Sequence, residues 1–376
     1  RVLVANRGEI AVRIIKACRK LGIETVLAVS EADRETLAAQ MADRTVCIGP
    51  APPLESYLKV NTLLMAALGT GANAIHPGYG FLAEQPELAE ACIQNGLTFI
   101  GPGPDSIRQM GDKLVARKTA IDLDIPLIPG SALITDLPQG WREAEKIGFP
   151  VLLKAAAGGG GKGMKAVHRP EEMETVFREA SAEARAAFGD DRLYMERFIP
   201  NARHIEVQIL SDCYNHCIHL FERDCSLQRR YQKVIEEAPS TAISEELKEQ
   251  MCNSAVLIAQ SIGYETAGTV EFVLDQDEKR FYFLEMNTRI QVEHPVTEMV
   301  TGVDLVAEQI RMAAGERLEL YQDDIQVTGH AMECRINAEC PDDNFRPSPG
   351  RIVKWEVPEG KGIRVDTHCF EKYFVP

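Results

Sequence analysis

The stretch Phe281-Tyr-Phe-Leu-Glu-Met-Asn-Thr-Arg-Ile-Gln-Val-Glu-His-Pro295 alternates polar and apolar side chains over most of its length. In an extended segment, successive side chains point to opposite faces. One face would then be wholly polar, and it would carry Glu285, Asn287, Arg289, Gln291 and Glu293. A solvated edge strand is the ordinary explanation for alternation. However, Asn and Gln placed between two carboxylates and one arginine are more typical of a set of ligands.

A second predicted strand, Thr269-Val-Glu-Phe-Val-Leu274, and a polar turn, Asp275–Arg280, precede this stretch and complete a hairpin. Folding the hairpin about Glu278 places Glu271 opposite Glu285. Like charges directly opposed on a sheet are destabilising, and a divalent cation would remove the conflict. With the amide oxygen of Asn287, the ligand set is all oxygen, which suits Mg²⁺ or Mn²⁺ better than zinc. The hairpin therefore predicts a metal site.

The size and composition of the chain exclude several classes of protein. Its 376 residues suffice for two or three domains. A net charge of -15 argues against nucleic acid as a partner. No apolar run approaches the roughly 20 residues of a membrane span, and no signal or transit peptide is visible. The 10 cysteines are irregularly spaced, which favours reduced thiols and a cytoplasmic location.

The first hundred residues alternate short apolar runs with amphipathic runs. The predicted strands are 2–5, 25–29, 45–48, 74–76 and 98–100, and the predicted helices are 9–21, 34–42, 56–67 and 84–95. This alternation predicts a parallel sheet with helices on both faces. Loops at the carboxyl ends of such strands border the active cleft, and Asn6–Glu9 and His76–Phe81 lie there. The first loop lacks GxGxxG, so a dinucleotide site is not predicted.

A small α+β module follows the break at Pro126, Pro129 and Gly130. Its predicted elements are a helix at 141–147, a strand at 151–154, a helix at 171–188 and a strand at 193–199. The loop Ala155–Met164 is not a Walker A motif, because a glycine follows Lys162 where Ser or Thr would hold magnesium. Its consecutive glycines let backbone N–H groups approach phosphate oxygens. We expect a phosphate lid rather than a flexible linker.

The pattern becomes antiparallel from Asn201 onward. Here the sequence predicts strands at 204–209, 216–221 and 329–339, and helices at 244–262 and 294–314. A basic group in this acidic protein comprises Arg223, Arg229, Arg230 and Lys233. The strand at 329–339 would carry Glu333, Arg335 and Asn337 on one face. A local basic pocket is what an anionic substrate would need in an acidic protein.

Seven co-linear blocks of the chain resemble the ATP-grasp superfamily and, within it, biotin carboxylases. The blocks are Ala5-Asn-Arg-Gly-Glu-Ile-Ala11, His76-Pro-Gly-Tyr-Gly-Phe-Leu82, Gly111-Asp-Lys113, Gly158-Gly-Gly-Gly-Lys-Gly-Met164, Glu222-Arg-Asp-Cys-Ser226, Glu285–Pro295 and Glu333-Cys-Arg-Ile-Asn-Ala-Glu339. The resemblance covers essentially the whole chain. It implies a Rossmann-like N-terminal domain at 1–112, an ATP-grasp central or lid domain at 113–200, and an ATP-grasp and C-terminal domain at 201–376. The last domain is expected to be incomplete, because the family continues with further strands and helices.

The resemblance also assigns residues to ATP and its metal. It implies two phosphate lysines, Lys113 and Lys154, and lid residues Gly160, Gly161 and Met164. The adenine-binding linker would be Glu196, Arg197, Phe198 and Ile199, with His204 and Gln228 nearby. The implied metal ligands are Glu271, Glu285 and Asn287, which agrees with the hairpin argument. Tyr231 stands where many relatives have His, so a nucleotide contact is not carried over to it. Lys162 replaces a common Arg and keeps the charge.

The other end of the site would handle bicarbonate and biotin. The resemblance implies a bicarbonate pocket of Arg289, Gln291 and Val292, with Lys233 beside it. Glu293 would be the general base, and Arg335 would hold the biotin enolate by charge-assisted hydrogen bonds. In the implied reaction, bicarbonate attacks the γ-phosphate of ATP, and the carboxyphosphate formed yields CO₂ for biotin. Positive groups must offset the charge of the two anionic reactants.

The implied partners are a biotin carboxyl carrier protein or domain, a carboxyltransferase and a second copy of the chain. The chain has no Ala-Met-Lys-Met biotinylation motif, so biotin would arrive on a carrier. Arg13 and Lys16 could serve a homodimer contact, but they are equally compatible with a solvated helix face. Two other functions stay open. They are a different ATP-grasp ligase that forms an acyl phosphate, and a non-catalytic nucleotide-binding module.

Overall fold

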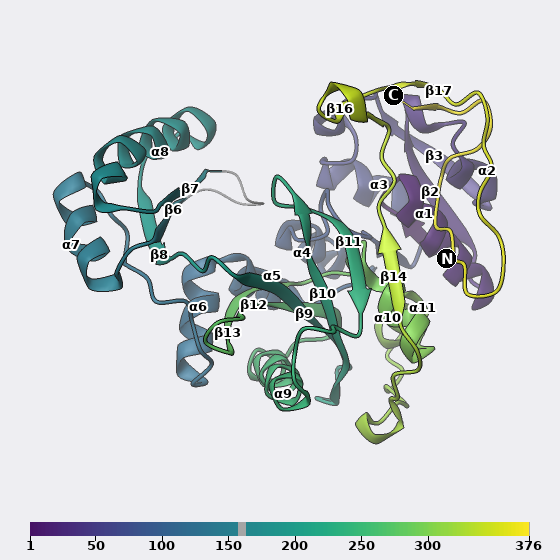
Figure 1. Cartoon of the computed structure of the whole chain (residues 1–376). Helices are drawn as coiled ribbons and strands as arrows, with labels where there is room; N and C mark the ends of the chain where they lie inside the picture. The colour runs from purple at the N-terminus through teal and green to yellow at the C-terminus, as the bar shows by residue number, and fades with distance from the viewer. Residues whose placement is uncertain (157–162, 376) are drawn as a thin grey trace.

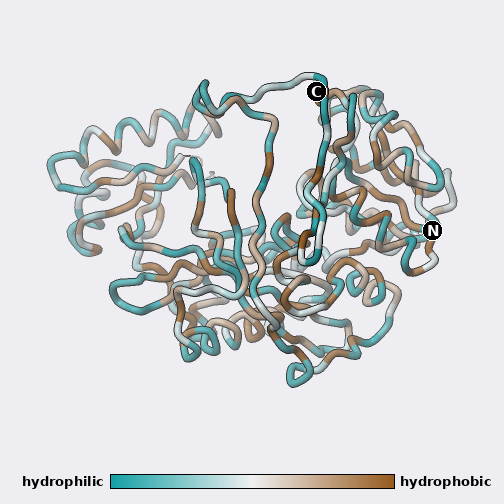
Figure 2. Tube along the Cα trace, turned by 45° about the vertical axis from the view of Figure 1, so that its right-hand side comes forward, coloured by the Kyte–Doolittle hydropathy of each residue, from teal (hydrophilic) through white to brown (hydrophobic). Residues whose placement is uncertain are grey.

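The computed structural model describes residues 1–156 and 163–375. In Figure 1 the N-terminal part of the chain and the module that carries α7 and α8 lie on opposite sides, with the long central strands between them. Figure 2 shows hydrophobic stretches recurring along the strands, while turns and peripheral segments are mostly hydrophilic. Among the described residues, no helix combines the length and the apolar character needed to cross a membrane.

The N-terminal domain is the predicted parallel sheet, with strand order β3-β2-β1-β4-β5. The strands are β1 (Val2–Val4), β2 (Thr25–Ser30), β3 (Arg44–Gly49), β4 (Ala74–His76) and β5 (Thr98–Phe99). The helices are α1 (Gly8–Lys20), α2 (Leu37–Met41), α3 (Val60–Thr70), α4 (Pro86–Gln94) and α5 (Pro104–Gly111). Val2 and Val4 pack with residues of α1, whereas Leu3 packs with residues of α3. The two faces of the sheet are thus covered by different helices, as the alternation of β1 requires.

The lid module, residues 137–197, has its own small sheet and core. Its antiparallel sheet has the order β7-β6-β8, and α7 and α8 contribute to the same core. The elements are α7 (Leu137–Ile147), β6 (Val151–Ala155), β7 (Met164–Val167), α8 (Met173–Phe188) and β8 (Leu193–Arg197). The glycine-rich loop joins β6 to β7, and Gly160, Gly161 and Lys162 lie outside the described residues. The predicted α+β module is therefore confirmed outside that loop.

A six-stranded antiparallel sheet in the order β13-β12-β9-β10-β11-β14 forms the centre. Its strands are β9 (Ala202–Ser211), β10 (Cys217–Arg229), β11 (Gln232–Ala238), β12 (Thr266–Asp275), β13 (Arg280–Asn287) and β14 (Ala331–Cys334). Helices α6 (Lys113–Asp122) and α9 (Glu245–Ser261) share one core with this sheet. Residues of α11 (Leu305–Ala313) share another core with α1, which joins the sheet to the N-terminal domain. Helix α10 (His294–Thr301) contacts β10, β11 and β14 of this sheet.

Short elements complete the described chain. Strand β15 (Glu339–Cys340) pairs with β16 (Arg346–Pro347), and β17 (Gly350–Arg351) pairs with β18 (Phe374–Val375). Five 3-10 helices are η1 (Glu31–Asp33), η2 (Pro53–Glu55), η3 (Pro170–Glu172), η4 (Gln322–Asp324) and η5 (Pro341–Asp343). The yellow C-terminal segment runs alongside the N-terminal domain in Figure 1.

Four sequence expectations about elements were wrong in their extent. The expected extended stretch 281–295 leaves the sheet after Asn287. The expected strand 216–221 is part of the longer β10, and its hairpin partner β11 was missed. The expected helix 294–314 is two helices, because Gly302 adopts a left-handed conformation (φ 75°) and ends α10. The expected strand 329–339 is confined to β14.

Candidate active site

The β12–β13 hairpin pairs its two glutamates as the sequence predicts. Glu271 lies opposite Glu285, and the register shifts by one residue between Glu271 and Phe272. The Nδ2 of Asn287 donates a hydrogen bond to Oε1 of Glu271 over 2.8 Å. Burial and the negative charge of Glu271 both raise the pKa of Glu285. Glu271 is buried and Glu285 is half-buried, and with Asn287 they occupy neighbouring positions of one hairpin, so their role as metal ligands stays a prediction.

The carboxylate row extends to a third strand, β9, which was predicted, but sequence reasoning did not place its Glu206 in the row. Glu206 of β9 lies directly opposite Glu271, so Glu285, Glu271 and Glu206 form a row across β13, β12 and β9. The polar positions 204, 206 and 208 of the alternating strand were the available signal. His204 lies in the same place, with Nε2 3.0 Å from Oε2 of Glu271. It thus lies against the predicted metal ligands.

Lys233 is the central cation of the site. Its Nζ lies 2.6 Å from Glu206, 2.9 Å from Glu271 and 2.6 Å from Glu293. Burial alone would lower the pKa of Lys233, but Glu206, Glu271 and Glu293 outweigh it and raise the pKa well above its usual value. Burial would likewise raise the pKa of Glu271, yet Lys233 and His204 lower it to about 2. One ammonium group thus binds three carboxylates at once.

Glu293 and Arg335 are also brought together. Arg335 donates through Nη2 to Oε2 of Glu293 over 2.9 Å, and through Nε to Oε1 of Glu236 over 2.6 Å. Glu293 is 2% exposed and precedes α10, where its Oε1 accepts from Lys233. Arg335 follows β14, and its backbone N–H still bonds the carbonyl of Val234. The pairing of Arg335 with Glu236 was missed, because β11 was not predicted.

The predicted bicarbonate residues lie next to this cluster. Arg289 donates through Nη2 to Oδ1 of Asn287 over 2.9 Å, and its Nε forms an ion pair with Glu84 at 2.9 Å. Gln291 donates through Nε2 to Oε1 of Glu271 over 2.8 Å. Val292 is half-buried and follows Gln291 in the irregular segment. Residues 289–293 therefore reach one place although their backbone is not a strand.

The predicted nucleotide residues line the module side of the site. Lys154 of β6 bonds the buried carboxylate of Glu196, whose other oxygen accepts from Nη1 of Arg117 over 2.9 Å. Glu196 is thus a counter-ion to two cations, which sequence reasoning did not foresee. Lys113 begins α6, and its positive charge lowers the pKa of Glu285 against the stronger effect of burial. The lysine predicted to bind phosphate and the glutamate predicted to bind the metal are therefore electrostatic neighbours.

The remaining linker and lid residues have mainly structural contacts in the described chain. Arg197 forms ion pairs with Asp275 at 3.2 Å and Glu278 at 2.5 Å. The backbone N–H of Phe198 bonds the carbonyl of Pro150, and Ile199 packs against Ile128 and Tyr282. Met164 begins β7 and is half-buried. Gln228 bonds the carbonyl of Cys225 within β10 over 2.9 Å.

The pair Glu236 and Glu333 should make the free energy of unfolding depend on pH. The two glutamates face each other across β11 and β14, and burial raises the pKa of Glu333 to about 8. The folded state then binds more protons than the unfolded state from about pH 4.5 to 8, so this group lowers stability as the pH rises. Glu333→Gln should therefore stabilise the protein at pH 8 more than at pH 5, by up to about 1.4 kcal/mol per pH unit. Urea unfolding at both pH values tests this, and an equal difference at both would contradict it.

A central antiparallel sheet with a row of carboxylates, joined to a small module with a glycine-rich loop, defines an ATP-grasp type of ATP-dependent ligase. Three family models match the chain. "Biotin carboxylase, N-terminal domain" matches residues 1–107, "Carbamoyl-phosphate synthase L chain, ATP binding domain" matches 112–321, and "Biotin carboxylase C-terminal domain" matches 333–376.

Relatives and solved structures agree with these models. A biotin carboxylase of Nostoc sp. is 53% identical, and biotin carboxylase 1 of Bacillus subtilis is 52% identical, each over the whole chain and 84% of the relative. One similar solved structure is the biotin carboxylase domain dimer of Hydrogenobacter thermophilus 2-oxoglutarate carboxylase, in complex with MgADP, ADP and bicarbonate. It has a TM-score of 0.94 and 49% sequence identity, and the match covers 100% of this chain and 83% of that chain. The Campylobacter jejuni biotin carboxylase complex with β-γ-ATP has a TM-score of 0.95 at 44% identity, with coverage of 100% and 84%. The chain belongs to the biotin carboxylase family.

Proposed function

We propose that this chain carboxylates biotin on a carrier protein, using ATP and bicarbonate through carboxyphosphate. The observation that carries the proposal is Glu293, a buried carboxylate held between Arg335 and Lys233, the lysine that also bonds Glu206 and Glu271 of the carboxylate row. A base for bicarbonate, a cation for the biotin oxygen and the ATP-side carboxylates are thus within one network. The named relatives and the MgADP–bicarbonate complex of a structural neighbour support this function.

The ATP end of the network would position the phosphates. We assign Glu271, Glu285 and Asn287 to Mg²⁺ or Mn²⁺, which when bound would offset the charge of the transferred phosphoryl group. Lys113 and Lys154 would bind phosphate oxygens, and Lys154 would exchange its bond to Glu196 for one to ATP. Met164 and the glycines 160 and 161 would cover the nucleotide. The linker 196–199, with His204 and Gln228 nearby, would bind the adenine.

The bicarbonate end would generate and align the nucleophile. Arg289 and Gln291 present N–H groups beside Glu293, so an anion there would accept their hydrogen bonds while Val292 limits the pocket. Glu293 would take the proton of bicarbonate, because its carboxylate is held in place by hydrogen bonds from Lys233 and Arg335. The bicarbonate oxygen would then attack the γ-phosphate to give carboxyphosphate and ADP. Positioning by fixed cations is the main source of catalysis in such transfers.

The same groups would then serve biotin. Carboxyphosphate yields CO₂ and phosphate, and the ureido nitrogen of biotin must lose a proton before it attacks CO₂. Arg335 would stabilise the negative charge that develops on the ureido oxygen. Because Arg335 bonds both Glu293 and Glu236, its guanidinium is held in one orientation before biotin arrives. We assign Arg289, Glu293, Arg335 and Lys233 as the catalytic residues.

We further propose three domains, at 1–112, 113–200 and 201–376, supported by the three larger sheets of the described chain, one of which lies in each range. Carrier protein, carboxyltransferase and a second copy of the chain are the proposed partners, the last supported by the dimer of the structural neighbour. A cytoplasmic location is supported by the 10 cysteines, all free thiols. The final carboxyl acceptor would be chosen by the carboxyltransferase.

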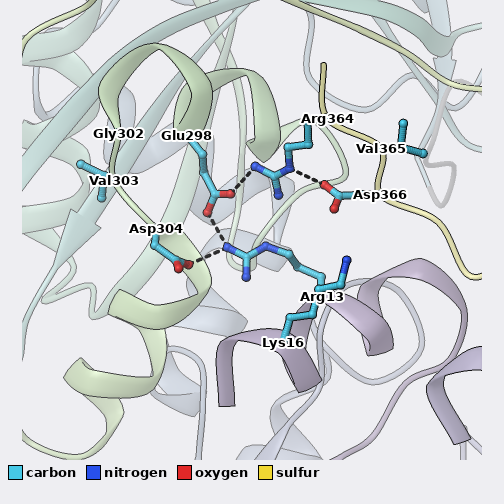
Figure 3. Close-up of a pocket in the computed structure, with 9 residues that line it drawn as sticks. All are labelled: Arg13, Lys16, Glu298, Gly302, Val303, Asp304, Arg364, Val365 and Asp366. Carbon is cyan, nitrogen blue, oxygen red and sulfur yellow. Dashed lines mark hydrogen bonds and ion pairs between the residues drawn. The ribbon is translucent and has the colours of Figure 1, made fainter. Parts of the chain in front are cut away.

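Arg13, which the sequence offered as a possible dimer contact, has hydrogen-bond partners within this chain. Figure 3 shows Arg13 and Arg364 pointing toward Glu298 from different segments. Arg13 bonds Glu298 over 2.8 Å and Asp304 over 2.6 Å, and Arg364 bonds the other oxygen of Glu298 over 2.7 Å. With 7% exposure, Arg13 joins α1 to Glu298 of α10 and to Asp304, the residue before α11, instead of facing solvent. Lys16, which is exposed, stays available to a partner.

Bicarbonate-dependent cleavage of ATP, stimulated by free biotin, tests the proposed function. We expect ADP release to require bicarbonate and to rise when biotin is added. A different ATP-grasp ligase would ignore biotin, and a non-catalytic module would bind ATP without releasing ADP. ADP release that is indifferent to both compounds would overturn the proposal.

Glu285→Gln tests the proposed metal site, because it should raise stability without Mg²⁺ and weaken the response of ATP cleavage to Mg²⁺. Without Mg²⁺, the variant should resist urea better than the parent chain, because the substitution removes the charge repulsion with Glu271. With Mg²⁺, it should need at least about tenfold more of the ion for half-maximal ATP cleavage, because one charged ligand is lost. Glu278→Gln at the hairpin turn is the matched control. A metal requirement unchanged from that of the control would contradict the assignment.

A further inference from the structure

Arg223 occupies the inner end of the carboxylate row. It lies on β10 directly opposite Glu206 of β9, so the row across four strands is Glu285, Glu271, Glu206 and Arg223. Its side chain is 0% exposed. A buried guanidinium carries a large desolvation cost, so its partners determine what it does. None of the roles proposed above uses this residue.

Each of the five N–H donors of Arg223 has an acceptor. The distances are 2.7 Å from Nε to Glu206, 2.7 Å and 3.0 Å from Nη1 to Gln208 and Thr297, and 3.2 Å and 2.9 Å from Nη2 to Thr269 and Gln291. Five donors in one planar fork is the full capacity of arginine. The acceptors come from β9, β12, α10 and the segment before α10. The guanidinium therefore fixes these four segments relative to one another.

The first consequence concerns Glu206, the carboxylate that Arg223 and Lys233 share. Arg223 bonds Oε1 of Glu206, and Lys233 bonds Oε2 of the same carboxylate. Glu206 is fully buried and is held ionised between these two cations. If Arg223 were lost, Glu206 would keep only one strong cation partner, and the anchor of Lys233 would weaken. Lys233 in turn orients Glu293.

The second consequence concerns the amide of Gln291. Its Oε1 accepts from Arg223, and its Nε2 donates to Glu271. An isolated glutamine amide can rotate and exchange its oxygen and nitrogen. Arg223 forbids the exchanged orientation, because an NH₂ group cannot accept a guanidinium hydrogen bond. The amide of Gln291 is therefore held with its N–H donors on the side of the row and of the proposed anion pocket.

We propose that Arg223 is a positioning residue for bicarbonate, acting through Gln291 and through the Glu206–Lys233 pair. It orients the Gln291 donors toward the anion and keeps Lys233 over Glu293. This inference rests on the proposed function, since it requires bicarbonate to bind beside Gln291. It predicts selective damage to bicarbonate binding, while nucleotide binding is preserved.

Arg223→Lys tests the inference, because lysine keeps the charge but cannot supply the planar fork. The readout is the bicarbonate concentration that gives half of the thermal stabilisation in Mg-ADP, measured on the whole chain. We expect this concentration to rise at least about tenfold, from the loss of charge-assisted hydrogen bonding, with the ADP midpoint within twofold of the parent chain. Arg203→Lys is the matched control, because Arg203 pairs with Asp224 at 3.0 Å and is not a partner of Arg223, and it should leave both midpoints near those of the parent chain. Equal midpoints for Arg223→Lys and Arg203→Lys would overturn the proposal.

Two further variants distinguish positioning from a general effect on folding. Gln291→Glu keeps the bond to Arg223 but has no donor for the anion, so bicarbonate should bind at least tenfold more weakly. In a Gln291→Ala background, Arg223→Lys should have a much smaller effect on bicarbonate than it has alone. Undiminished bicarbonate binding by Gln291→Glu would refute the role of the amide even if Arg223→Lys did not fold. A parent chain that binds no bicarbonate would instead refute the proposed function.

Discussion

Glu293→Gln is expected to lower bicarbonate-dependent ATP cleavage and biotin carboxylation by about 10²–10⁴-fold, the usual contribution of a general base. Glutamine keeps the shape of the side chain but cannot take a proton at neutral pH. Its NH₂ group also cannot accept the bond that Arg335 now donates to Oε2. Steady-state release of ADP, with and without free biotin, measures the loss.

The matched control is Glu237→Gln, the same substitution at a glutamate outside the network. Glu237 lies on β11 and pairs with His330 at 3.2 Å. This variant should keep the parental rate, and both variants should bind Mg-ATP with similar affinity. If Glu293→Gln turned over as fast as the control, Glu293 would not be the base.

Lys233→Met is expected to reduce the free energy of unfolding by about 3–5 kcal/mol, the usual cost of removing one partner from buried ion pairs. The substitution leaves the carboxylates of Glu206, Glu271 and Glu293 close together, and the side chain of each is no more than 5% exposed. The loss should shrink as the pH falls, because protonated carboxylates no longer repel one another. Urea unfolding at pH 7.5 and pH 5 measures both effects.

Lys165→Met is the control for this loss. Lys165 pairs with Glu179 and Glu183, whose side chains are 55% and 60% exposed. Pairs with such exposed carboxylates contribute little, so the control should lose less than about 1 kcal/mol. A similar loss in both variants would show that Lys233 is not the central cation of a buried cluster.

The hairpin could be predicted because its pairing is local. The turn at Asp275–Arg280 fixes the register, so Glu271 and Glu285 could be placed opposite each other before the fold was known. Glu206 could not be placed in that way, because β9 reaches β12 across a long insertion that contains β10, β11 and α9. Alternation placed Glu206 on the polar face of its strand, but it did not show which strand would lie beside it.

Arg223 was hidden by an irregularity in its own strand. Phe221 has a positive φ of 61°, and the pairing of β10 with β9 shifts between His219 and Glu222. The alternation of side chains is therefore interrupted just before Arg223, and its inward direction is not readable from the pattern. Arg230 and Tyr231 also have positive φ values, 51° and 64°, without a glycine to signal the turn. The hairpin partner β11, with Lys233 and Glu236, was missed for this reason.

The segment after Asn287 was mispredicted for the opposite reason. Its side chains alternate regularly in the sequence, but its backbone is irregular. Gln291 and Glu293 alternate with apolar residues, yet the segment before α10 is not a strand. The two side chains reach the network because Gln291 bonds Glu271 and Arg223, and Glu293 bonds Lys233 and Arg335. Long-range hydrogen bonds, which no local pattern encodes, fix their positions. The resemblance supplied their roles, and those roles stay predictions.

We propose that one network, built around Lys233 and Glu293, serves both bicarbonate attack on ATP and biotin carboxylation. The most direct test supplies ¹⁸O-labelled bicarbonate with ATP, Mg²⁺ and biotin, and follows the label by mass spectrometry. If bicarbonate attacks the γ-phosphate, one of its oxygens must appear in inorganic phosphate, and carboxybiotin must form in equal amount. We expect both products from the parent chain and neither from Glu293→Gln. Phosphate that carries only solvent oxygen, or carboxybiotin formed without labelled phosphate, would contradict the account.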